Sequence, residues 1–205
     1  MIRAWLELPP LGIFLTLAAL YFGVVIALRI LIFSSPLSRQ MQSLTGIVAP
    51  FFNASAILFA LLAGFLANDI ADRSRQAYKA VQTEAGELRN VYTLSVAALA
   101  DMAAIREALK TYATSVTVDE WPAMTEGHGS ARTSAAYDEL LRKISDPSIA
   151  KSSGGAVHAA LLNAAVRAGN ARTERLAIAS DHTNDLKWIV VIVLGLITEI
   201  SIALV

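Results

Sequence analysis

Three long apolar stretches alternate with polar sequence along this chain. They cover residues 11–33, 46–67 and 188–205, and each is long enough for a helix to cross the hydrocarbon core of a bilayer. Between the second and the third, residues 68–187 carry most of the charged side chains. The pattern predicts an all-α membrane protein with three parts: a transmembrane helical hairpin in 1–67, a soluble helical bundle, and a C-terminal transmembrane helix.

The second apolar stretch has one face of small side chains and one amide. Positions three or four apart share a helix face, and here they are Gly46, Ala49, Asn53, Ala56, Ala60, Ala63 and Ala67. The first stretch has a similar stripe of Gly12, Thr16, Ala19, Gly23 and Ala27. Because small faces let membrane helices pack closely, we expect these two helices to form an antiparallel hairpin, small face against small face.

The polar middle keeps a helical period. No proline interrupts the second helix beyond the membrane, so we expect it to extend to about Val96. Pro122 should end a following helix that begins near Asp101, since the residue before a proline is disfavoured in helical geometry. The remaining helices are expected at 132–145 and from Ala156 without a break into the third apolar stretch.

Composition supports a membrane protein and excludes several other classes. Hydrophobic residues make up 55% of the chain and the mean hydropathy is +0.53, against roughly 45–50% apolar residues in soluble domains. The 17 basic and 17 acidic residues cancel, so we expect no nucleic-acid partner. Cysteine is absent, and the three histidines lie far apart in the sequence. We therefore expect no catalytic residues, no metal site, no cofactor and no enzymatic activity.

Charged residues on apolar helix faces indicate an internal ion-pair network. Glu84 falls on such a face of the second helix and Arg172 on one of the last polar helix, and charges there need partners. Asp119 and Glu120 would lie at a helix C-terminus, where the dipole disfavours them, so they should pair with Arg89, Arg172 or Arg175. We expect a direct pair of Glu84 with Arg172. The predicted network is Glu84, Glu120, Trp121, Arg172 and Arg175; a ligand or ion site is the alternative.

Polar residues inside the apolar stretches are the second candidate site. Glu199 follows Trp188 by eleven residues, and an ionisable group at that depth in a membrane helix is a functional hypothesis. Asn53 reaches a similar depth. Either a neutral Glu199 hydrogen-bonds Asn53 and joins two helices, or both line an ion path that Phe52 and Phe59 narrow. The pore-lining candidates are Phe52, Asn53, Phe59 and Glu199.

Basic residues near the ends of the apolar stretches set the expected orientation. One side of the membrane would carry Arg3, Arg73, Arg75, Lys79 and Lys187, and the other Arg39 and Arg29. By the positive-inside rule, the N-terminus and the helical bundle are expected in the cytoplasm.

Residues from the second apolar stretch to the third also form a recognisable pattern. They are Ala77, Val81, Glu84, Ala85, Leu88, Tyr92, Tyr112, Val116, Glu120-Trp121-Pro122, Met124, Gly127, Arg172, Arg175, Leu176 and Trp188. Over roughly residues 45–200, with Glu-Trp-Pro as the most specific element, the chain resembles the bacterial bestrophin-like membrane proteins, a family of unknown function. The resemblance implies a multi-pass protein of the bacterial inner (plasma) membrane, with two membrane helices before the bundle and two after it. We therefore expect that a fourth helix is missing here or that this member is shortened.

A remoter similarity connects this layout with true bestrophins, which are pentameric anion channels. It rests on the run from Pro50 to Phe59 in the second apolar stretch. We interpret the chain as a homo-oligomeric ion (anion) channel whose partners are the lipid bilayer, further copies of itself and a small ion. The alternative is a non-conducting sensory or scaffolding module with a helical signalling domain.

Overall fold

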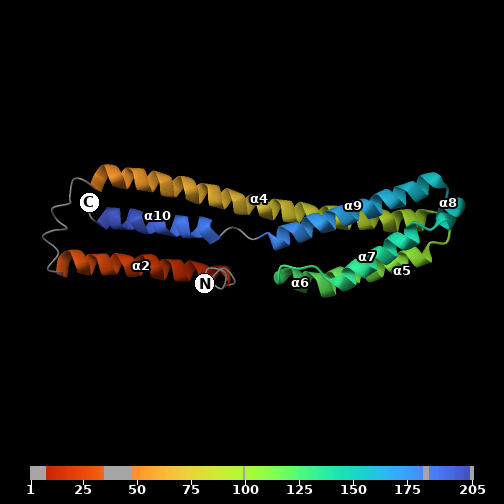
Figure 1. Ribbon diagram of the computed structural model, residues 1–205, viewed down its shortest axis with the longest axis horizontal. Helices are drawn as coiled ribbons and strands as arrows, with labels where there is room; N and C mark the ends of the chain where they lie inside the picture. The colour runs from red at the N-terminus through yellow and green to blue at the C-terminus, as the bar shows by residue number, and fades with distance from the viewer. Residues whose placement is uncertain (1–7, 35–47, 99, 182–184, 204–205) are drawn as a thin grey trace. The chain divides into compact units, whose positions relative to one another are not determined.

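The computed structural model describes residues 8–34, 48–98, 100–181 and 185–203, and their side chains except at 10, 31–34, 48–52, 185 and 203. All secondary structure in these residues is helical, as predicted (Figure 1). The chain divides into two compact units: Met1–Ile70 with Thr183–Val205, and Ala71–His182. Helix α4, Val48–Ala97, contributes to both units.

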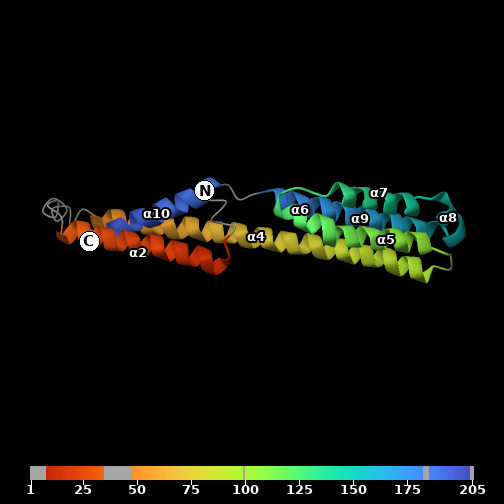
Figure 2. The same ribbon diagram turned by 90° about the horizontal axis from the view of Figure 1, so that it is seen from below.

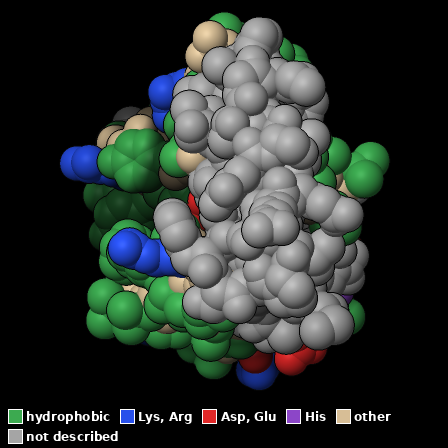
Figure 3. Space-filling view, turned by 90° about the vertical axis from the view of Figure 1, so that its left-hand side faces the viewer, with side chains coloured by type: hydrophobic (Ala, Val, Ile, Leu, Met, Phe, Trp, Pro, Cys, Tyr) green, Lys and Arg blue, Asp and Glu red, His purple; other side chains and the backbone are tan. Residues whose placement is uncertain are grey.

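The first unit consists of apolar helices. It contains α2 (Pro10–Ser34), the first part of α4, and α10 (Asp185–Ala203). Two helices of the described residues are long and apolar enough to cross a membrane, with spans placed in Leu11–Ile30 and Asn53–Ala97. The described surface seen end-on in Figure 3 is mostly hydrophobic. Large side chains such as Phe14, Phe22 and Phe65 are exposed on these helices, as expected for surfaces that face lipid.

The predicted contact between the small faces of the first two helices is not confirmed. Thr16, Ala19, Gly23 and Ala27 of α2 are all exposed. Instead α2 lies beside α10, where a Cβ placed on Gly195 would collide with the hydroxyl of Tyr21 and lie 3.2 Å from Cε2 of Phe59. The rings of Tyr21 and Phe59 thus pack against Gly195, whose missing side chain allows the close approach.

The second unit is a helical bundle (Figure 2). Its helices after α4 are α5 (Ala103–Ser115), α6 (Trp121–Thr125), α7 (Ala131–Ile144), α8 (Pro147–Ser153) and α9 (Gly155–Ser180). The predicted extension of the second helix is confirmed, since α4 ends at Ala97. The apolar face of α5 is buried at Ile105, Leu109 and Tyr112, next to the buried Met102 at its N-cap, and α5 packs on α7.

The prediction that Pro122 ends the helix before it is wrong. A π-helical segment, η1 (Val116–Glu120), joins α5 to α6, and the N–H of Trp121 donates to the carbonyl of Val116 five residues earlier. The wide turn ends the hydrogen-bond register of α5, so Pro122 falls in the first turn of a new helix, where its missing N–H costs nothing. Asp119 and Glu120 therefore lie inside a helical stretch rather than at its C-terminus.

The predicted unbroken helix from Ala156 into the third apolar stretch is also wrong. Helix α9 ends at Ser180, and Asp181 has an extended backbone with φ −84° and ψ 104°. Arg73 of α4 holds Asp181 there: it donates to the backbone carbonyl at 2.8 Å and pairs with the carboxylate at 3.1 Å. Ser and Asp favour such ends because their side chains compete for backbone hydrogen bonds.

Candidate functional site

Four charged side chains meet in the middle of the bundle, and three helical segments supply them. Glu84 comes from α4, Glu120 from η1, and Arg172 and Arg175 from α9. The two arginines are three residues apart on a helix, so they share one face. The structure thus brings together the four charged residues of the predicted network.

Arg175 bridges the two carboxylates. Its Nε donates to Oε2 of Glu84 at 2.8 Å and its Nη2 donates to Oε1 of Glu120 at 2.7 Å. The guanidinium is 2% exposed and the Glu120 side chain 0% exposed. Charge-assisted bonds of this kind are short and strong, and they offset the cost of burying the ions.

Arg172 completes the network on the other side of Glu120. Its Nε donates to Oε2 of Glu120 at 3.0 Å, and its Nη2 donates both to the same oxygen and to Oγ of Ser134 at 3.0 Å. Two carboxylates and two guanidinium groups leave the network with no net charge. The arrangement therefore joins α4, η1, α7 and α9 without an unbalanced buried charge.

The direct pair of Glu84 with Arg172 that we predicted is not the one observed. Glu84 pairs with Arg175, and Arg172 pairs with Glu120. Both arginines lie on the same face of α9, one turn apart, and only the helix register in the folded bundle decides which one reaches α4. Asp119 lies nearer the surface, where it pairs with Arg132 at 3.5 Å, a partner we did not predict.

Tyr112 is the network residue that the sequence did not reveal as such. Its hydroxyl donates to Oε1 of Glu84 at 2.6 Å, and its side chain is fully buried. Burial raises the pKa of Tyr112 well above its usual range, and the neighbouring Glu84 charge adds to the effect. A buried phenol usually has a hydrogen-bond partner, so a tyrosine within the apolar stripe of α5 was the available signal.

The pKa of Glu120 is lowered although the residue is buried. Burial acts to raise this pKa, and the hydrogen bonds from Arg172 and Arg175 lower it by more. The pKa values of the two arginines are raised: burial lowers them, but the glutamates more than compensate. The geometry therefore keeps Glu120 and both arginines ionised.

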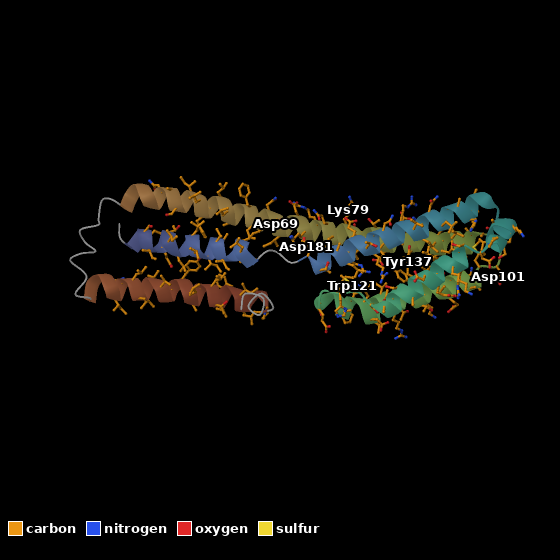
Figure 4. The ribbon with its side chains drawn as sticks, viewed as in Figure 1. Asp69, Lys79, Asp101, Trp121, Tyr137 and Asp181 are labelled. Atoms are coloured by element: carbon orange, nitrogen blue, oxygen red, sulfur yellow. The ribbon has the colours of Figure 1, made fainter. Side chains whose placement is uncertain are left out.

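Residues of α6 and of the loop after it pack around the ion-pair network. The Trp121 ring lies 5.9 Å from Cζ of Arg175, within range of a cation–π interaction, and Met124 places its sulfur on the same guanidinium. Figure 4 labels Trp121, the first residue of α6, and Tyr137 of α7. A Cβ on Gly129 would lie 3.9 Å from Oε2 of Glu120, at ordinary van der Waals distance, so this loop residue adjoins the network. The site is built to hold helices together.

The pore-lining candidates all fall in the first unit. The side chain of Phe52 lies outside the described residues, Asn53 is exposed on α4, and Phe59 packs toward Gly195. Glu199 is half-buried on α10, and its Oε2 makes no hydrogen bond within the described residues. The predicted Asn53–Glu199 hydrogen bond is absent from the part of the chain that the structure describes.

Acidic and histidine side chains do not gather into a metal site in the part that the structure describes. No group of three His, Cys, Asp or Glu residues there could hold a metal ion. The buried carboxylates Glu84 and Glu120 are instead occupied by guanidinium groups.

Fold and site define an all-helical protein in which membrane-length helices are joined to a bundle with a neutral, buried ion-pair network. A family model described as "Bestrophin-like domain" matches residues 18–205. The chain belongs to the bestrophin-like family, which confirms the resemblance noted in its sequence. No curated protein matches it. No solved structure matches it either.

Proposed function

We propose that this protein is an integral membrane protein that assembles into a homo-oligomer and conducts small ions along its α4 helices. By the remote similarity to true bestrophins, the ion is an anion. The protein would lie in the bacterial inner membrane, with its helical bundle in the cytoplasm. Lipid, further copies of the chain and the conducted ion are its proposed partners.

The observation that carries this proposal is an exposed polar position on an apolar helix. Asn53 shares one face of α4 with Ile57, Ala60 and Gly64, and all four are exposed. An amide that faces lipid finds no hydrogen-bond partner, whereas one that faces another protein chain or a water-filled path does. This face of α4 is therefore suited to the inside of an assembly.

The small residues of the same face favour contact with α4 helices from other copies of the chain. A Cβ placed on Gly64 would meet nothing within 4 Å, so a second helix has room to approach there. In a ring with cyclic symmetry the same face of each copy points to the axis, and small residues in that face permit close packing in a membrane. Copies of α4 arranged around an axis would bring their Asn53 amides together beside an ion path.

Ion currents through the purified protein in a planar bilayer test the proposal. The natural chain should conduct, and Asn53→Asp should move selectivity towards cations because it adds negative charge to the path. Asn53→Gln is the matched control, since it keeps a neutral amide. A folded protein that carries no current would contradict the channel and favour the non-conducting sensory or scaffolding module.

A further inference from the structure

A groove runs between α4 and α10 in the first unit. Its volume is about 300 Å³ and its walls are apolar; they are formed by Leu62, Phe65, Leu66, Leu186, Val190 and Val191. At one end Nζ of Lys187 donates to Oδ2 of Asp69 at 3.0 Å. Figure 4 labels Asp69 at this position on α4. The groove is thus apolar along its length and charged at one end only.

The charged end of the groove lies where the sequence of both helices changes between apolar and polar residues. On α4 the apolar run ends at Ala67, and polar residues follow from Asn68 onward. On α10 the apolar run begins at Trp188, directly after Lys187. Tryptophan and lysine are typical of the level of the lipid headgroups. If both helices are in a membrane, the walls lie among acyl chains and the ion pair lies at the headgroups.

We propose that this groove binds one phospholipid, with an acyl chain along the apolar walls and the phosphate on Lys187. The Lys187 ammonium has three N–H donors, and one of them donates to Asp69. The lysine side chain is 48% exposed. A phosphate can therefore reach it while the ion pair persists. The site rests on the membrane placement proposed above but does not depend on ion conduction.

A second copy of the chain fits this groove less well. It would have to cover the Lys187–Asp69 pair, and burying an ion pair costs more free energy than its attraction returns unless the geometry is excellent. A phospholipid leaves the pair at the membrane surface and adds a negative charge beside the lysine. The exposed Lys187 ammonium, which has three donors, and the apolar walls therefore favour the lipid.

Native mass spectrometry of the full chain tests the phosphate contact. The protein is titrated with palmitoyl-oleoyl phosphatidylethanolamine and with the diacylglycerol that has the same acyl chains but no phosphate. The phospholipid should bind the natural chain roughly tenfold more tightly, the size of one charge-assisted hydrogen bond. Lys187→Gln should bring the two lipids to equal affinity, whereas Lys79→Gln, which removes an exposed lysine from the other unit, should not.

Two valine substitutions on α10 test the groove itself. Val190 lines the groove and is 38% exposed, while Val193 lies outside it and is 46% exposed. Val190→Phe should fill the groove and reduce phospholipid binding by roughly tenfold, and Val193→Phe should leave binding unchanged. The two variants add the same bulk to the same helix, so a general effect on folding would appear in both.

Three results would overturn the proposal: equal binding of the two lipids by the natural chain, equal effects of Lys187→Gln and Lys79→Gln, or equal effects of Val190→Phe and Val193→Phe. Loss of self-association without loss of lipid in Val190→Phe would assign the groove to a second copy and overturn it as well. Ion currents and lipid binding are separate measurements, so the failure of this site is distinguishable from the failure of the channel.

Discussion

Arg175 is the cation that both buried carboxylates of the bundle share. It contacts both buried carboxylates, whereas Arg172 contacts only Glu120. If Arg175 is removed, Glu84 keeps the Tyr112 hydroxyl but loses its cation. Removing Glu84 and Arg175 together leaves the neutral Glu120–Arg172 pair. The network should therefore tolerate the double change far better than either single change.

A double-mutant cycle of Glu84→Gln and Arg175→Met measures this dependence. Each single change should lower the free energy of unfolding by about 3–5 kcal/mol, because it leaves an uncompensated buried charge. The double change should cost much less than the sum, with unfolding followed by circular dichroism. The exposed Asp119–Arg132 pair is the control and should show a coupling of about 0–1 kcal/mol. Additive effects at Glu84 and Arg175 would show that the two do not meet.

Acid should weaken the bundle through Glu120. Its folded-state pKa is lowered, because the hydrogen bonds from Arg172 and Arg175 outweigh the opposing effect of burial. Its contribution to stability is therefore complete above the ordinary glutamate pKa of 4.5 and is lost as the pH falls through the lower, folded value. The midpoint of thermal unfolding should fall between pH 5 and 3, and Glu120→Gln, less stable at pH 7, should show a smaller fall. Parallel curves for the two proteins would contradict this assignment.

At the scale of elements, close packing of helices in the bundle depends on where side chains leave room. Gly169 of α9 faces Tyr137 of α7, whose hydroxyl donates to the carbonyl of Ala165 at 3.0 Å. A Cβ at Gly169 would collide with that hydroxyl. Gly86 of α4 has nothing within 4 Å of an added Cβ. Packing therefore requires glycine at position 169 but not at position 86.

Replacing each glycine by alanine separates these cases. Gly169→Ala should destabilise the bundle by about 1–3 kcal/mol, because it forces Tyr137 away from α9. Gly86→Ala should stabilise it by about 0.5–1 kcal/mol, since it only reduces the freedom of the unfolded chain in an open helix position. Midpoints of thermal unfolding that move in the same direction for both variants would rule out the tight contact at Gly169.

Helical periodicity predicted the elements better than it predicted their ends and partners. The face of α5 from Met102 to Tyr112 and the length of α4 follow from a period that local sequence carries. The π-helical turn before Pro122 and the break at Asp181 depend on hydrogen bonds that form only in the folded bundle. The same is true of the pairing of Glu84 with Arg175, because the register between α4 and α9 is a tertiary property. Burial of charges could be predicted; the choice among arginines could not.

At the scale of the whole molecule, the proposed orientation places the bundle in the cytoplasm. The chain has no cysteine, so a single introduced one can report its side of the membrane. Gly127 is unsuitable, since its φ of 80° is a left-handed conformation that favours glycine. His128 is exposed in the same loop. His128→Cys should be protected from an impermeant thiol reagent in intact cells and labelled after permeabilisation. Labelling in intact cells would show that the bundle lies on the opposite side of the membrane.

The central claim is that the Asn53 face of α4 meets the same face in other copies of the chain. Oxidative cross-linking of a single cysteine in native membranes tests it directly. Asn53→Cys should form covalent dimers rapidly, because the proposed assembly brings these positions together. Ile26→Cys, on an exposed face of α2 that the proposal leaves to lipid, should remain monomeric. Monomeric Asn53→Cys, or equal cross-linking at the two positions, would contradict the account.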